Sequence, residues 1–186
     1  GAAADALEAE MPEIEYVTAL APPTWPGFDR FVLSANERNI RATGQYAGKD
    51  YFNIFSYRLI QGDAEQVLAD KNSIVISEDI AMKLFNTKNN VVGKTIGFQH
   101  ERDFVVSGVF QNIPATSSTQ FDFVLSFETF KEMKPWAGEW SSSGPHVYLV
   151  LHEGTDVRAF NEKILDFSAK KTNSDITYRR TFVTSY

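Results

Sequence analysis

Residues 93–95, Gly-Lys-Thr, form the segment that comes closest to a nucleotide-binding motif. A phosphate-binding loop also needs a glycine five positions before Gly93, because its backbone amides must cradle the phosphate groups. Lys88 occupies that position. The sequence therefore does not predict a nucleotide site, and we interpret the segment as a turn that leads into a strand.

Histidine, cysteine and serine chemistry is not predicted either. His100, His146 and His152 lack the spacing of four residues that places two zinc ligands on one helix face. The sequence contains no cysteine, which excludes thiolate catalysis, disulfides and cysteine-ligated zinc. It also lacks the Gly-x-Ser-x-Gly elbow of many serine hydrolases, and residues 141–144 are typical of a polar loop. We expect no metal and no cofactor.

Two pairs of carboxylates could in principle act as a general acid and a general base. They are Glu78 with Asp79, and Glu101 with Asp103. The first pair falls in the first turn of an expected helix, where acidic side chains are favourable. The second lies at an expected hairpin end. We interpret both pairs as structural, so no catalytic residue is predicted and the chain is not expected to be an enzyme.

The tryptophans are the strongest candidates for binding. Trp25 lies in a proline-rich loop, whereas Trp136 and Trp140 lie in a segment followed by serines and glycine. Large aromatic side chains on loops often cover a core. When they are exposed, they are common anchors for binding partners. We take Trp25, Trp136 and Trp140 as candidate partner-binding residues that would contact a partner subunit or cargo, with core packing as the alternative.

The elements that must position these residues are a mixture of strands and helices. The first helix is expected at residues 3–11, since Leu7, Met11 and Ile14 share one face and Pro12 limits it. A short helical turn is expected at 50–55. Strands are expected at residues 31–34, 39–47, 57–61, 73–76, 95–99, 103–110, 121–125, 146–151 and 176–183.

Three later helices are predicted from their caps and apolar faces. Ser77 and Ser126 can each cap a helix, and Thr155 or Asp156 can cap the last one. The side chains expected on the inner faces are Ile80, Ala81, Leu84 and Phe85, then Phe127, Phe130 and Met133, then Val157, Phe160, Ile164 and Phe167. Because strands and helices do not alternate regularly, we predict an α+β fold with a mixed sheet and packed helices.

Charge and hydropathy argue against nucleic-acid binding and against a membrane-spanning helix. The 186 residues carry a formal net charge of −6, which disfavours nucleic-acid binding, because nucleic-acid binders cluster Lys and Arg against phosphate. No apolar run approaches the roughly 18 residues that a membrane-spanning helix needs. A chain of this length can bury a core of its own.

Four sequence blocks in a fixed order carry a family resemblance. They are Tyr-Phe-Asn-Ile-Phe at 51–55 with Gly-Asp at 62–63, Ile-Val-Ile-Ser at 74–77 with Leu-Phe at 84–85, Val-Gly-Lys-Thr-Ile at 92–96, and residues 105–110. In this order they resemble the MacB-like periplasmic core domain of FtsX-like ABC transporter permeases, over residues 5–165. Residues 112–118 and 121–123 resemble the variant found in Bacteroidetes-type permeases.

The resemblance implies a single extracytoplasmic core domain over residues 1–186, on the periplasmic side of the inner membrane. It implies a porter-like lobe built from both chain ends and a small β-rich lobe inserted at about residues 55–125. The expected function is non-catalytic: coupling the motion of transmembrane helices to transport or efflux outside the membrane. The implied partners are transmembrane helices of the same chain on both sides, a cytoplasmic ABC ATPase and a second copy in a dimer.

Two alternatives belong to other functional classes. A periplasmic ligand-binding sensor module would show a deep pocket with converging polar groups. A periplasmic hydrolase would need an acid, a base or a nucleophile in such a pocket, and the sequence offers no support for one.

Overall fold

A mixed β-sheet is the main feature of the computed structural model, which describes residues 1–141, 144–175 and 179–185. The strands are β1 Ile14–Ala21, β2 Phe31–Ala35, β3 Arg38–Ala42, β4 Gly44–Ala47, β5 Leu59–Gln61, β6 Ser73–Ser77, β7 Thr95–Phe98, β8 Arg102–Phe110, β9 Phe123–Ser126 and β10 His146–Leu151. Their order is β10-β1-β4-β9-β6-β8-β7-β2-β3, and β5 pairs with β8. The pairs β4–β9 and β6–β8 are parallel, and the others are antiparallel.

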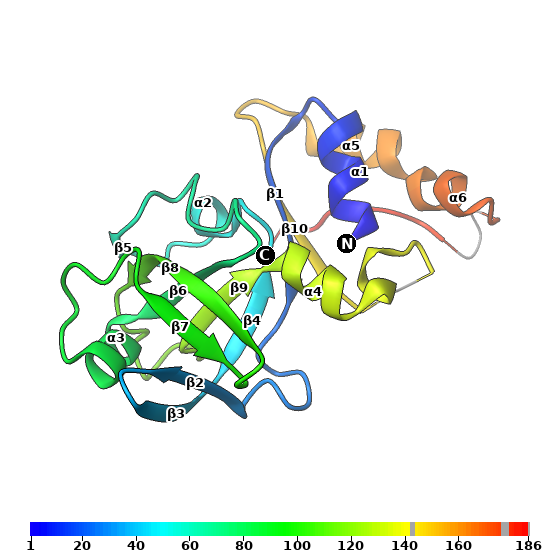
Figure 1. Ribbon diagram of the computed structural model, residues 1–186. Helices are drawn as coiled ribbons and strands as arrows, with labels where there is room; N and C mark the ends of the chain where they lie inside the picture. The colour runs from blue at the N-terminus through cyan, green and yellow to red at the C-terminus, as the bar shows by residue number, and fades with distance from the viewer. Residues whose placement is uncertain (142–143, 176–178, 186) are drawn as a thin grey trace.

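Helices lie at one end of the molecule and around the sheet (Figure 1). They are α1 Ala2–Glu10, α2 Tyr51–Ile54, α3 Glu78–Phe85, α4 Phe127–Met133, the 3-10 helix η1 Pro135–Gly138, α5 Val157–Ile164 and α6 Phe167–Thr172. Helices α1, α5 and α6 lie together at one end, whereas α2 and α3 lie against the strand-rich body, and β1 and β10 run between the two parts (Figure 1). This arrangement confirms the α+β prediction.

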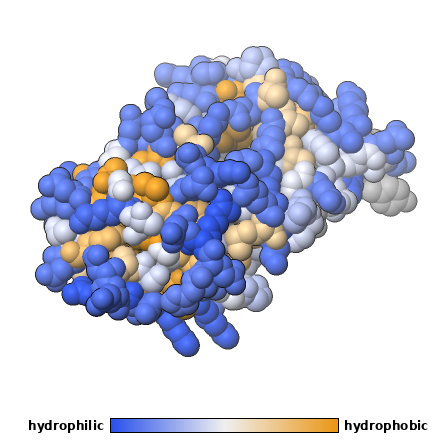
Figure 2. All heavy atoms as spheres, in the orientation of Figure 1, coloured by the Kyte–Doolittle hydropathy of each residue, from blue (hydrophilic) through white to orange (hydrophobic). Residues whose placement is uncertain are grey.

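Three apolar clusters hold these parts together. The largest lies on one face of the sheet and includes Tyr46, Phe104 and Phe123. The second lies on the opposite face, because Ala47, the strand neighbour of Tyr46, belongs to it. The third joins α1 to α5 and α6 through Leu7, Met11, Phe160, Ile164 and Phe167. On the face shown in Figure 2, hydrophobic residues gather over the strand-rich body and hydrophilic residues surround them.

The structure corrects two strand predictions near the start of the chain. Strand β1 was not expected, although it pairs with both β4 and β10. The expected strand at 39–47 is two strands, because Thr43 interrupts it. The Thr43 amide donates to the Asp122 carboxylate at 2.7 Å, and the Asp122 amide donates to the Thr43 carbonyl at 2.7 Å. These bonds end the β2–β3 pairing and begin the β4–β9 pairing.

The prediction of a final strand at 176–183 is also wrong for its described part, residues 179–183; residues 176–178 lie outside the described residues. The Thr181 amide donates to the Leu165 carbonyl at 3.0 Å. The Asn161 side chain binds both backbone polar groups of Val183, at 2.7 and 3.1 Å. This segment is therefore held against α5 by its backbone groups, which leaves them unable to pair with a strand.

Two side chains expected on inner helix faces are exposed instead. Val157 is 51% exposed and Met133 is 45% exposed. Val157 is the first residue of α5 and Met133 is the last of α4, so each lies beyond the part of its helix that contacts the core. The predicted caps are present, since the side chains of Ser77, Ser126 and Asp156 accept hydrogen bonds from backbone amides in the first turns of their helices.

The division into a porter-like lobe and an inserted lobe stays a prediction, and strands from both regions share one sheet.

Candidate functional site

The structure separates the three candidate tryptophans. Trp25 and Trp136 stack with their ring centroids 6.1 Å apart and their planes at 30°. Phe130 lies beneath both rings, 5.8 Å from Trp25 and 5.7 Å from Trp136. Trp25 is half-buried against the largest core cluster, whereas Trp136 is 41% exposed. Trp136 is therefore the exposed outer ring of an aromatic stack.

Trp140 belongs to a different part of the molecule. Its ring packs against Phe167 of α6 with centroids 6.0 Å apart, in the cluster that joins α1 to the C-terminal helices. The Arg179 guanidinium donates to its carbonyl at 3.0 Å. The core-packing alternative therefore fits Trp140, and the binding alternative fits Trp136. Partner binding by any of the three stays a prediction.

Helix α1 and its neighbours form a second candidate site, which we call the α1 junction. It consists of four acidic residues on or just after α1 and the four lysines that they contact. The pairs are Asp5 with Lys131, Glu8 with Lys49, Glu10 with Lys171, and Glu13 with Lys163. Their nitrogen–oxygen distances are 3.2 Å for Asp5, 2.6 Å for Glu8 and 2.6 Å for Glu13.

The four lysines of the α1 junction come from four separate segments. Lys131 lies on α4 and Lys49 follows β4, so both belong to the strand-rich body. Lys163 lies on α5 and Lys171 on α6. The acidic side chains of the α1 junction thus connect the two parts of the molecule, and the apolar side chains Leu7 and Met11 pack on the C-terminal helices. Such surface ion pairs contribute little energy each, but together they fix the orientation of the helix.

The shifts in pKa of three residues of the α1 junction agree with these ion pairs. The hydrogen bond from Lys163 lowers the pKa of Glu13, and the hydrogen bond to Glu8 raises the pKa of Lys49. For Lys131, partial burial alone would lower the pKa, but the hydrogen bond to Glu128 and the charge of Asp5 raise it overall. Glu13, Lys49 and Lys131 therefore stay charged near neutral pH.

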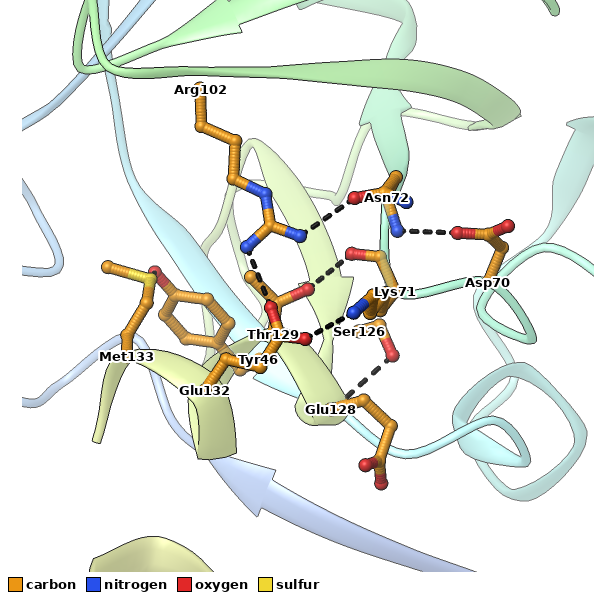
Figure 3. Close-up of polar contacts among 10 residues, drawn as sticks. All are labelled: Tyr46, Asp70, Lys71, Asn72, Arg102, Ser126, Glu128, Thr129, Glu132 and Met133. Carbon is orange, nitrogen blue, oxygen red and sulfur yellow. Dashed lines mark hydrogen bonds and ion pairs between the residues drawn. The ribbon is translucent and has the colours of Figure 1, made fainter. Parts of the chain in front are cut away.

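A smaller polar cluster fixes α4 to the sheet (Figure 3). The Glu132 carboxylate receives hydrogen bonds from Lys71, at 2.5 Å, and from Arg102, at 3.0 Å. The same guanidinium donates to the Asn72 amide oxygen at 2.7 Å. The Thr129 hydroxyl donates to the Lys71 carbonyl. These contacts hold Lys131, and through it Asp5, in a fixed position relative to the sheet.

A hollow lies beneath α1 with a cavity volume of about 180 Å³. Small side chains such as Ala4, Ala19 and Ala69 line it together with Asp5 and Glu8. Ligand pockets are usually larger, roughly 300 Å³ or more. The sensor-module alternative gains no support from this hollow.

The other residues with potential chemistry have structural surroundings. His100, His146 and His152 are exposed at strand ends or in a turn, and no group of His, Asp or Glu in the described parts of the chain could hold a metal ion. Glu78 and Asp79 pair with Lys88 and Lys83 in the first turn of α3. Gly93 has a φ of 86° in a turn before β7, as interpreted from the sequence.

Comparison with known proteins identifies the architecture. The family described as MacB-like periplasmic core domain matches residues 1–167. The chain belongs to this family. No protein with a curated description matches it. Within the described residues, no helix has the length and apolar character needed to cross a membrane.

Three solved structures share the fold of this MacB-like domain. A domain assigned to a permease protein of Porphyromonas gingivalis is 22% identical, with a TM-score of 0.70, covering 92% of this chain and 76% of that one. The periplasmic region of MacB from Actinobacillus actinomycetemcomitans is 16% identical, with a TM-score of 0.61 and coverages of 92% and 73%. The extracellular domain of the noncanonic ABC-type transporter YknZ from Gram-positive bacteria is 14% identical, with a TM-score of 0.59 and coverages of 92% and 82%.

Sequence reasoning did not find the α1 junction, because each acid and its lysine lie far apart in the chain. One signal was available. The first Lys or Arg of the sequence is Arg30, so the acids at positions 5, 8, 10 and 13 cannot find a cation within their own helix. Acidic side chains in such a segment must either be solvated by water or form ion pairs with cations from distant segments.

Proposed function

We propose that this domain is the non-catalytic extracytoplasmic part of an ABC transporter permease, and that it couples movement of the transmembrane helices to work outside the membrane. It would lie on the periplasmic side of the inner membrane. Its partners would be the transmembrane helices of the same chain and a cytoplasmic ABC ATPase, with a second copy in the complete transporter.

The α1 junction carries this proposal. A helix that receives motion from the membrane must pass it to the rest of the domain without bending or sliding. The α1 junction contacts both parts of the molecule, through Lys49 and Lys131 on one side and Lys163 and Lys171 on the other. Because side chains from both parts bind the same helix, a displacement of α1 would move them together.

The positions of the two described chain ends support the same proposal. Gly1, Ala2 and Ala3 line a depression together with Val147 of β10. Thr184 and Ser185 line a groove that also includes Val147. Both described ends therefore reach the same strand, β10. A domain inserted between two membrane helices needs such neighbouring connections.

The test uses the full-length permease with its ATPase in lipid nanodiscs. The chain lacks cysteine, so Met82→Cys on α3 provides a single, exposed position for a fluorophore in this domain. Energy transfer to labelled lipid headgroups reports the height of the body above the membrane. We expect ATP to change this signal in the parent protein, and the combined substitutions Asp5→Asn, Glu8→Gln, Glu10→Gln and Glu13→Gln to reduce the change while ATP hydrolysis continues.

The matched control removes acids whose partners lie within their own helix. Asp79, Glu162 and Asp166 each pair with a cation four residues away. Changing these three to Asn, Gln and Asn removes three negative charges, one fewer than in the test variant, without separating α1 from its neighbours, so the signal should stay as in the parent. An ATP response that survives loss of the four α1-junction acids would contradict the coupling role.

A further inference from the structure

Three residues around the end of α4 form an exposed surface, which we call the Trp136 patch: Met133, Lys134 and Trp136. Met133 is 45% exposed and Trp136 is 41% exposed. Lys134 is exposed and has no ion-pair partner among the residues that the structure describes. The only acidic side chain of η1 and its caps is Glu139, which accepts a hydrogen bond from the Ser141 hydroxyl at 3.1 Å.

The Trp136 patch is held rigidly from below. Trp25 and Phe130 pack against the inner side of the Trp136 ring, and the Tyr46 hydroxyl donates to the Met133 sulfur at 3.7 Å. Gly144 lies so close to both tryptophans that a Cβ atom there would be 3.2 Å from each ring. An exposed ring with so much support beneath it keeps its position without a partner, so it is ready to bind one.

The patch adjoins the start of α1. Ala137, the residue after Trp136, is buried, and its carbonyl contacts Gly1 so closely that no side chain would fit there. If the proposed function holds, the chain that enters α1 comes from the membrane. The 3-10 helix that carries Trp136 then lies beside the point where the chain leaves the bilayer.

We propose that the Trp136 patch rests on the lipid headgroup layer and orients the domain on the membrane. Tryptophan is enriched at this depth because its ring is apolar and its indole N–H is polar. A lysine can extend its charged end toward lipid phosphates while its stem stays among apolar groups. Three side chains are too few to anchor a free protein, so the contact acts on a domain that is already tethered. This proposal rests on the proposed function only for the position of α1.

The test tethers the 186-residue chain to lipid vesicles through a histidine tag before Gly1, with nickel-chelating lipid in a mixture of phosphatidylethanolamine and phosphatidylglycerol. A spin label is placed at Met133→Cys or, as a matched control, at Met82→Cys, which is 46% exposed on α3. We expect the label at 133 to become more accessible to oxygen and less accessible to a water-soluble nickel complex. The label at 82 should show neither change.

A second pair of variants separates contact from folding. With the label at 133, Trp136→Ala should abolish the lipid signal, and Trp136→Phe should keep part of it, while thermal unfolding shows that both fold. Equal accessibilities at 133 and 82 would overturn the proposal and leave the coupling role untouched, because that role is tested by the ATP response. A concentration-dependent dimer with the patch at its interface, seen by sedimentation, would also overturn it by assigning the surface to a second copy.

Discussion

Gln45 on β4, an interior strand of the sheet, shows what a single residue can contribute to stability. Its side chain is 1% exposed, and neither its amide nitrogen nor its amide oxygen finds a hydrogen-bond partner among the described protein groups. A buried polar group without a partner costs about 1–3 kcal/mol. We expect Gln45→Met, which keeps the length of the side chain, to raise the free energy of unfolding by about 1 kcal/mol in urea titrations.

Gln61 is the matched control for this substitution. Its amide nitrogen donates to the Lys88 carbonyl, and its amide oxygen accepts from the Val91 amide at 3.3 Å. Gln61→Met should therefore lower the stability. If Gln45→Met were also destabilising, Gln45 would have to be hydrogen-bonded in solution.

Glu132 gives a prediction about pH. Hydrogen bonds from Lys71 and then Arg102 lower the pKa of Glu132 below its ordinary value of 4.5. A carboxyl group whose pKa is lowered by folding stabilises the fold above its unfolded pKa, and this contribution disappears as the pH falls through the folded value. We expect the stability difference between the parent and Glu132→Gln to be largest at neutral pH and to shrink as the pH falls below about 4.5.

Urea titrations across this pH range provide the measurement. Glu153→Gln serves as the control, because no ion pair of Glu153 occurs among the described residues. A stability difference for Glu132→Gln that stays constant down to acidic pH would show that the charge of Glu132 does not act in the folded state.

At the scale of elements, helix α5 holds α1 through one face only. Phe160 is 3% exposed in the cluster with Leu7 and Met11, whereas Val157, on the same helix, is 51% exposed. Phe160→Ala should destabilise the domain by about 3–5 kcal/mol through the cavity that it leaves. Val157→Ala should change stability by less than about 0.5 kcal/mol. Chemical denaturation compares the two, and similar losses would mean that α5 packs differently in solution.

The two tryptophans around η1 should behave differently for the same reason. Trp140 packs against Phe167, so Trp140→Ala should lower the melting temperature clearly. Trp136 is exposed on its outer side, so Trp136→Ala should lower it much less. Differential scanning calorimetry of the two single variants decides this, and a larger loss for Trp136 would favour the core-packing interpretation for that residue.

At the scale of the whole molecule, periodicity and capping predicted the local elements and missed the long-range ones. Helix α3, with its Ser77 cap and its apolar face, was predicted correctly, and so was the hairpin of β7 and β8. Both are determined by residues that lie close together in the sequence. Strand β1 was missed because five of its consecutive residues, 17–21, are buried, which hides the alternation that marks a half-exposed strand.

In the candidate site, too, local features could be predicted from the sequence and long-range contacts could not. The tryptophans could be named from their loops, but only packing could show that Trp136 is exposed and Trp140 is not. The α1 junction could not be predicted, because Glu10 and Lys171 meet only after the chain has folded. Charge pairs between distant segments leave no local pattern in a sequence.

The pairing of β1 with β10 has a consequence for how the chain matures. Ile14 lies opposite Leu151 and Leu20 lies opposite His146, so β1 pairs with β10. Among the strands described, β10 is the one that the ribosome synthesises last. During synthesis, β1 must wait with apolar side chains uncovered until about residue 151 has emerged. Contacts between distant residues slow folding, because the loop must close before the contact is made. The β1–β10 part of the sheet should therefore form late, and the nascent chain is vulnerable to aggregation or proteolysis until the residues up to Leu151 have emerged.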